Sequence, residues 1–313
     1  MRPVLRPGAV LLRRDRDHVQ LGVEPGHAVV VRDSATLQAL LPRLDGLRAR
    51  ETVVAACPDG RAATNALDAL ITAGVVVDAD DVRAAPLPAE LAHLLSRHHP
   101  DAARKRLQAR RAATLSLVAS APAVVDLLVT AGTLLVGSGV GRLVADQDVA
   151  EGIPTGNWRH TLPAPDVQTD VVLVAGTPAA SPDARSLVAA GVPHLAVSLV
   201  DGIAIIGPFV RPGRTACLGC VDRTRVARDP AWPALVQQLG PNLPTPAVHD
   251  LPAPRSRVLE SAAATWAVRD LLAHLAGDRV LCYGSSLRFA DDLVEQVVHR
   301  WELHPGCECC LLS

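Results

Sequence analysis

Two short cysteine groups, far apart in the chain, constrain the fold most. Cys217-x-x-Cys220 lies in the run "CLGC", and Cys307-x-x-Cys310 lies in "CECC". Two such pairs are typical of a closed, tetrahedral four-thiolate zinc site, which has no open position for water or substrate. We therefore expect a structural Zn²⁺ that fastens the C-terminal tail to the body of its domain. Cys309 offers a competing Cys307-x-Cys309 pair, and the spacing leaves both ligand sets open.

Length and composition indicate a globular protein with more than one domain. The chain has 313 residues, with 49% hydrophobic residues, 20% charged residues and a formal net charge of −1. Because domains usually span ~100–200 residues, two are expected. The balanced charge argues against a general binder of nucleic acid or of an anionic membrane. No secretory signal or membrane span is apparent, so we expect a cytoplasmic protein with reduced or metal-bound cysteines.

Residues 1–83 predict a winged helix-turn-helix domain. Three short apolar runs, "AVLLRR", "HVQLGV" and "HAVVVRD", have the character of strands. Helical spacing follows in "SATLQALLPRLDG", "RETVVAAC" and "RAATNALDALITAG", with Ser34 placed to cap the first helix and Gly46 to end it. A DNA-binding regulator is one interpretation of this order. Its recognition helix would be "RAATNALDALITAG", whose one Arg and one Asp suit phosphate contact and base readout poorly.

The remainder divides into a linker and an α/β domain. Residues 84–113 are rich in Ala, Arg, His and Pro, and we interpret them as a helical linker broken at Pro100. From Thr114 the sequence alternates strands such as "TLSLVAS" and "DVVLVAG" with helices such as "PDARSLVAAG". This alternation predicts a Rossmann-like, mostly parallel sheet over residues 114–313, ending in a hairpin. The Ala-rich helix "VLESAAATWAVRDLLAHLAG" fits core packing, with a homodimer interface as the alternative.

The glycines of "VGSGVGRLVADQDV" do not form a phosphate loop. Such a loop needs a strand before it and a helix after it, because the helix N-terminus binds the phosphate. Here a long apolar helix precedes Gly137, and the segment after Gly141 has the character of a strand. The glycines therefore suit the end of the preceding helix. The position of a true loop, "ASAPAVV" after "TLSLVAS", contains no glycine, and Pro122 removes an N–H donor.

These motifs together resemble a known superfamily. The order of "TLSLVAS", "GVGRLVADQDV", "DVVLVAGTP", "GPFVRPGRTACLGC" and "HPGCECC" is similar to that of the ThiF/MoeB, ubiquitin-activating-like proteins. The run that begins at Gly207 most resembles the ThiF-like partners of YcaO cyclodehydratases, which act in azoline formation on ribosomally made peptides. That resemblance implies a PqqD-like N-terminal element that binds a precursor's leader peptide.

The resemblance also implies that nucleotide chemistry is lost. The superfamily's phosphate-binding glycines would fall on Ala119, Ala121 and Val124, and its Mg²⁺-binding Asp on Thr177. The ribose-binding acid is retained as Asp146, the vestige of a nucleotide site. We therefore expect no catalytic residue and no ATP cofactor. An active ThiF-type adenylyltransferase is the alternative that ATP binding or pyrophosphate exchange would restore.

The function that we expect is that of a non-catalytic scaffold. The leader peptide would add as a strand beside "HAVVVRD", with its apolar side chains against the helix "RAATNALDALITAG". The ThiF-like domain would then dock on a YcaO-type cyclodehydratase that forms the azolines, as in bacteriocin-type natural products. Strand alternation and helical spacing select five peptide-contacting residues: Val29, Val31, Leu67, Leu70 and Ile71.

Overall fold

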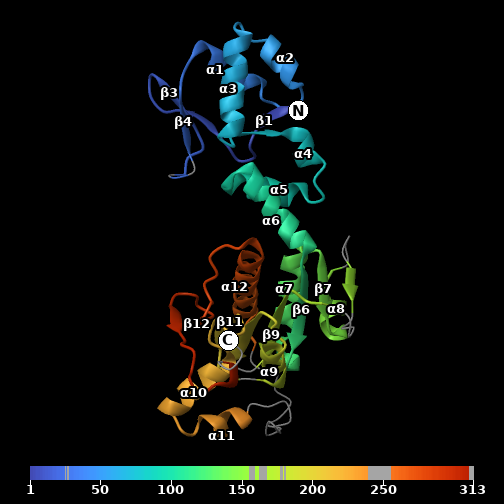
Figure 1. Cartoon of the computed structure of the whole chain (residues 1–313), viewed down its shortest axis with the longest axis vertical. Helices are drawn as coiled ribbons and strands as arrows, with labels where there is room; N and C mark the ends of the chain where they lie inside the picture. The colour runs from blue at the N-terminus through green and yellow to red at the C-terminus, as the bar shows by residue number, and fades with distance from the viewer. Residues whose placement is uncertain are drawn as a thin grey trace. The chain divides into compact units, whose positions relative to one another are not determined.

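A computed structural model describes residues 1–24, 26, 28–154, 159–161, 168–176, 179, 181–238 and 255–309. The chain divides into two compact units, Met1–Gln108 and Ala109–Ser313 (Figure 1). The boundary lies within the segment 84–113 that the sequence assigns to a helical linker. No helix among the described residues is long and apolar enough to cross a membrane.

The first part of unit 1 has the strand and helix order expected of a winged helix. Strands β2 (Leu11–Arg13), β3 (His18–Leu21) and β4 (Val29–Arg32) form an antiparallel sheet in the order β2-β3-β4. Helices α1 (Ala35–Leu40), α2 (Arg50–Ala55) and α3 (Gly60–Thr72) follow, with a 3-10 turn, η1 (Leu41–Arg43), after α1. Ser34 caps α1 as predicted, and its side chain accepts from the N–H of Leu37. Apolar residues from β3, β4, η1 and the three helices form one core, whereas the residues of β2 are exposed.

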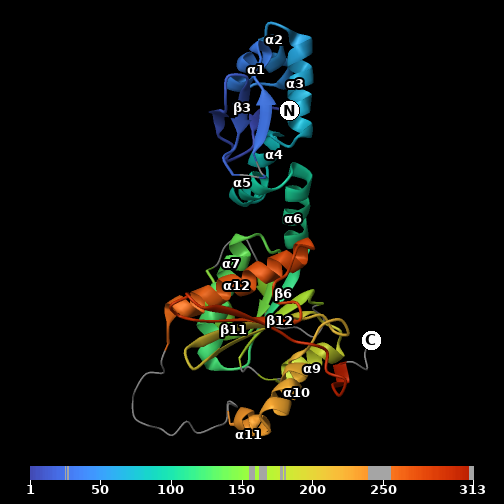
Figure 2. The same ribbon diagram turned by 90° about the vertical axis from the view of Figure 1, so that its left-hand side faces the viewer.

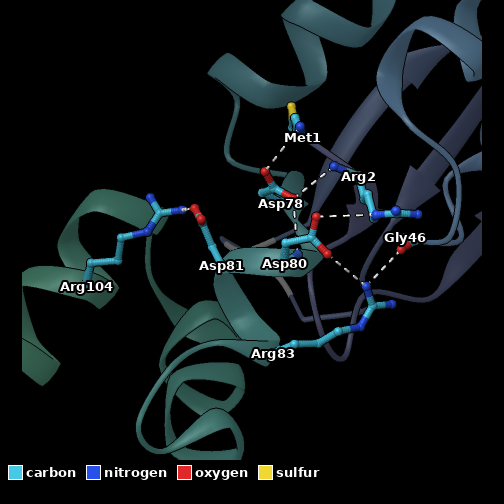
Figure 3. A network of polar contacts seen from close by, with 8 residues as sticks. All are labelled: Met1, Arg2, Gly46, Asp78, Asp80, Asp81, Arg83 and Arg104. Carbon is cyan, nitrogen blue, oxygen red and sulfur yellow. Dashed lines mark hydrogen bonds and ion pairs between the residues drawn. The ribbon is translucent and has the colours of Figure 1, made fainter.

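A second group of elements completes unit 1. Strand β1 (Pro3–Leu5) pairs antiparallel with β5 (Val76–Asp78), and helices α4 (Ala79–Arg83), α5 (Pro88–Arg97) and α6 (Pro100–Ala112) follow. Helices α5 and α6 share a small core with β5. Polar contacts fasten α4 on both sides: Asp81 pairs with Arg104 of α6 at 2.8 Å, and Asp78 accepts the N–H of Arg2 (Figure 3).

Unit 2 is built on a mixed sheet of eight strands in the order β13-β12-β11-β10-β9-β6-β7-β8. Five strands run parallel: β6 (Thr114–Ala119), β7 (Arg142–Ala145), β8 (Arg159–Thr161), β9 (Val171–Gly176) and β10 (His194–Val200). The last three are antiparallel: β11 (Ile203–Val210), β12 (Ser285–Ala290) and β13 (Gln296–Arg300). The Rossmann-like architecture and the terminal hairpin are thus as predicted.

Helices cover both faces of this sheet (Figure 2). On one face, α7 (Val125–Gly137), after the short turn η2 (Pro122–Val124), packs against α12 (Arg257–Ala276), with α8 (Gln147–Gly152) beside α7. The other face carries α9 (Pro182–Ala189) and α10 (Leu218–Arg228), and α10 contacts α11 (Trp232–Gln237). The alanines of α12, including Ala263, Ala264 and Ala267, are buried in the main core. The small-residue face of α12 therefore serves core packing.

The glycines after α7 end the helix, as their sequence context predicts. Gly137 is the last residue of α7, and Gly139 has a φ of +89°, a left-handed conformation that favours glycine. Gly141 lies so close to the backbone of Arg111 that an added Cβ would fall 1.8 Å from its carbonyl oxygen. The next segment is not all strand, as the sequence suggested, because helix α8 begins directly after Asp146.

Candidate functional site

The structure brings four cysteines together at the start of α10. Cys217 occupies the N-cap position of α10, and Cys220 lies in its first turn. Cys307 and Cys309 come from the segment after β13. All four side chains are buried, and their sulfur atoms lie within 4.8 Å of one another. Cys310, which the sequence placed in the site, lies outside the described residues, whereas its rival Cys309 is in the cluster.

The spacing of these sulfur atoms suits a tetrahedral metal. The Sγ–Sγ distances are 3.9 Å for Cys217–Cys220, 3.6 Å for Cys217–Cys307 and 3.3 Å for Cys220–Cys309. Zinc–sulfur bonds of ~2.3 Å arranged as a tetrahedron give sulfur–sulfur edges of about 3.8 Å. The buried cluster is therefore able to bind a metal such as zinc with only small adjustments.

The electrostatics of the cluster favour a thiolate. The Cys217 thiol donates a hydrogen bond to the Cys220 sulfur, which lowers the pKa of Cys220 to about 4 and raises that of Cys217. The backbone N–H of His304 also points to the Cys220 sulfur, at 3.4 Å. Burial raises the pKa of Cys309. A cation bound among the four sulfurs would replace the shared protons and allow all four to ionise.

An apolar shell surrounds the sulfur atoms. Val210 and Ala216 pack directly with the four cysteines, and Val188 and Trp301 cover them. Since all four positions of a tetrahedral metal would be taken by protein sulfur, no site for an activated water would remain. A metal bound by the four cysteines would thus join two segments that are distant in the sequence: the start of α10 and the tail after β13.

The edge of the sheet where the parallel strands end shows what occupies the place of a phosphate loop. Between β6 and α7, the N–H of Ser120 bonds to the carbonyl of Ala175, and its hydroxyl lies 3.3 Å from a carboxylate oxygen of Asp183. A Cβ added to Gly176 would lie 2.7 Å from the Cβ of Ser120. The chain here packs against the end of β9 instead of forming an open cradle of N–H groups.

The first turn of α7 contains a carboxylate, that of Asp126. Asp126, in the first turn, pairs with Arg255 at 2.6 Å and with Arg257 at 2.7 Å. Although desolvation opposes the shift, the hydrogen bond and charge of Arg255 lower the pKa of Asp126. Glu260 of α12, which is buried, accepts from both arginines. Asp126 therefore holds the electrostatically favourable position at the helix N-terminus.

Asp146, the expected ribose-binding acid, lies at the end of β7. It is exposed, occupies the N-cap position of α8 and makes no capping hydrogen bond with its side chain. Thr177, the position of the superfamily's Mg²⁺-binding acid, lies outside the described residues. A role for Asp146 in ribose binding thus stays a prediction, and the described residues bring it no phosphate-binding partner.

The five predicted peptide-contacting residues divide into two groups. Leu67 and Leu70 of α3 are 0% and 3% exposed, inside the core of the first unit. Val29, Val31 and Ile71 are half-buried at the border of that core. Only these last three offer side-chain surface to a peptide.

The free side of β4 has backbone groups available for pairing. Among the described residues β4 pairs with β3 alone, at the border of its sheet. The N–H of Asp33 bonds to the carbonyl of Asp17. Because hydrogen-bonded and non-bonded pairs alternate, Val31–Val19 and Val29–Leu21 are also hydrogen-bonded pairs. The N–H and C=O groups of Val30 and Arg32 consequently point away from β3. Sequence periodicity identified the strand but could not show that this edge is free.

The exposed face of α3 is not that of a DNA-recognition helix. Asp68, which is exposed, pairs with Arg50 at 2.7 Å, so this face has a neutralised charge pair beside Arg61. Few cations remain to contact phosphate.

The sequence matches no protein-family profile, and no curated protein is detectably similar to it. Solved structures, in contrast, resemble it along nearly its whole length. A heterocyclase in complex with substrate and cofactor has a TM-score of 0.67 at 15% identity, covering 98% of this chain and 39% of its own. The heterocyclase TruD gives 0.65 at 16% identity, covering 98% and 42%. Escherichia coli MccB with ATP gives 0.59 at 13% identity, covering 99% and 100%.

At these identities the likeness concerns the fold. The chain spans about two fifths of the length of the two heterocyclases, and the whole length of MccB. The matches cover unit 1 as well as unit 2, so the combination of the two folds in one chain is itself shared. This protein thus has the fold of MccB and of the corresponding part of the heterocyclases.

Proposed function

We propose that this protein is a non-catalytic scaffold that binds the leader peptide of a ribosomally made precursor and presents it to a YcaO-type cyclodehydratase. The observation that carries the proposal is the free edge of β4, with outward N–H and C=O groups at Val30 and Arg32. Val29 and Val31 alternate with them and face the core, beside Ile71. The backbone of a leader strand would bond to Val30 and Arg32. Its apolar side chains would pack against Val29, Val31 and Ile71.

The turn between β6 and α7, where a phosphate loop would lie, supports a role without catalysis. Ser120 fills the loop position with its hydroxyl beside the Asp183 carboxylate, and Arg255 and Arg257 at the start of α7 are already engaged by Asp126. An MccB structure contains ATP, and another contains AMPCPP with MccA. The shared fold makes an active adenylyltransferase the alternative, and the changed loop disfavours it here.

Fluorescence polarisation tests the proposal with labelled leader peptides from short reading frames beside the gene. Val30→Pro removes an outward N–H without removing one that bonds to β3, and Val30→Thr keeps it. We expect Val30→Pro to weaken binding at least about tenfold and Val30→Thr to change it less than about threefold. Equal binding by both variants would refute strand addition at β4. Binding by no candidate leader would refute the peptide-binding role.

A further inference from the structure

A second feature of unit 2 belongs to neither the cysteine cluster nor the nucleotide edge. A cavity of about 560 Å³ lies where β12 begins and β13 ends. Three exposed arginines, Arg214, Arg279 and Arg300, line it, with Glu302 as the acidic residue of its wall. Within the described part of the chain, no carboxylate lies within ion-pair distance of any of the three guanidinium groups. The cavity is therefore cationic.

Strand β13, beside this cavity, is an open sheet border. In the described residues it pairs with β12 only. Val297 and Val298 of β13 are 55% and 47% exposed, and Val294, just before the strand, is 79% exposed, which is unusual for apolar residues at a sheet edge. An exposed apolar edge of this kind marks an interaction surface or a site of aggregation.

The register shows which backbone groups of β13 are free. The N–H of Trp301 bonds to the carbonyl of Gly284, directly beyond the Ser285–Arg300 pair. Because hydrogen-bonded and non-bonded pairs alternate along antiparallel strands, His299 and Val297 also bond to β12. The N–H and C=O groups of Val298 and Arg300 therefore point outward. The side chains of the same two residues line the cavity.

We propose that β13 and this cavity form a docking site for an extended acidic segment of a partner protein. The segment adds as a strand to β13 and places its carboxylates among Arg214, Arg279 and Arg300. Charge complementarity selects this occupant, because the three unpaired cations would oppose a second copy of the same border. The site is separate from the leader-binding edge of β4 and does not depend on the proposed function.

The geometry also sets the side-chain pattern of the bound strand. Residues opposite each other in a β-ladder share a face, so an acidic residue opposite Arg300 lies two positions from an apolar residue opposite Val298. The residue between them faces His299 and Trp301, whose rings are in contact with their centroids 4.1 Å apart. Acidic and apolar residues that alternate on one face, with aromatic residues between them on the other face, therefore fit best.

The cysteine cluster holds both walls of the cavity. Arg214 and Thr215 directly precede the loop to Cys217, and Trp301 with Leu303 precedes Cys307. Joining Cys217 to Cys307 fixes the two segments relative to each other. Docking at this site is thus expected to need an intact cluster.

The test uses the full chain and a fluorescein-labelled eight-residue peptide with two repeats of Glu-Tyr-Val-Tyr. A second peptide has Lys in place of each Glu. We expect saturable, salt-sensitive polarisation with the Glu peptide only. Arg300→Glu and Val298→Pro should each weaken it at least tenfold, and Val298→Thr less than threefold. Two control variants should leave binding of the Glu peptide unchanged. Arg61→Glu makes the same charge change at an exposed position of α3, and Val30→Pro alters the edge strand β4.

Each other outcome overturns the proposal. Weakening by Arg300→Glu without weakening by Val298→Pro would indicate a simple anion site and no strand addition. Loss of binding with Val30→Pro would assign the peptide to β4. Absence of saturable binding by a folded, metal-loaded chain would exclude the site, and so would sedimentation showing a dimer that Val298→Pro dissociates.

Discussion

Cys309 and Cys310 are neighbours in the sequence, yet only one can complete a set of four ligands. The sulfur of Cys309 lies 3.3 Å from that of Cys220, inside the cluster. We expect Cys309→Ser to lose bound zinc and most of the stability of unit 2, because one thiolate of four is removed. Cys310→Ser and Cys57→Ser, the latter buried in unit 1, should retain one zinc per chain. Elemental analysis of the purified variants measures this, and zinc loss in Cys310→Ser alone would contradict it.

One buried histidine, His194, and one half-buried histidine, His274, predict a pH dependence of stability. Burial lowers the pKa of His194, and burial with the charge of Arg211 lowers that of His274, each from 6.5. Below about pH 6.5 the unfolded state binds more protons than the folded state, so the free energy of unfolding falls on acidification. The double variant His194→Gln/His274→Gln should show a shallower fall between pH 7 and 5 in urea titrations. His93→Gln, at an exposed site, should follow the unsubstituted protein; an unchanged slope in the double variant would refute the linkage.

Single residues also show where sequence patterns stop being informative. The cysteines were identifiable because their chemistry is specific, but two spacings fitted and only packing separates Cys309 from Cys310. Leu67 and Leu70 were assigned to a peptide groove from helical spacing. Both side chains lie on the face of α3 that packs in the core. Helical spacing alone cannot distinguish a face that packs in the core from one that lines a groove.

The turn after α7 yields a matched pair of glycine substitutions. Gly137 has open space around it at the end of a helix, so Gly137→Ala should stabilise the protein by about 0.5 kcal/mol. A Cβ on Gly141 would meet the Arg111 carbonyl at 1.8 Å, so Gly141→Ala should destabilise it by about 3 kcal/mol. Thermal unfolding of both variants measures this, and similar effects at the two positions would show that the glycines are not used as described.

Among the elements, long periodic segments were predictable and short or mixed ones were not. The alternation from Thr114 onward identified β6, β9 and α9. Strand β11 did not stand out, because Gly207 and Pro208 interrupt its apolar run and proline usually marks a strand as interrupted. Helix α8 has six residues, too few to show a helical period.

In the molecule as a whole, the fold that it shares with MccB is combined with a filled turn between β6 and α7. Both compact units are present, and the fold matches MccB along the whole length of MccB. At the β6–α7 turn, Ser120 packs against Gly176 and Asp126 is held by two arginines. We propose that the protein acts by binding and not by adenylation.

Calorimetric titration with ATP and Mg²⁺ tests this claim most directly. We predict no saturable heat up to ~1 mM ATP, a concentration at which even weak specific sites of −4 kcal/mol are half filled. Replacing Asp126 by Asn should not create binding, because the loop still lacks a phosphate cradle. Saturable binding in the low micromolar range, abolished by Asp146→Ala, would contradict the account and restore the adenylating enzyme.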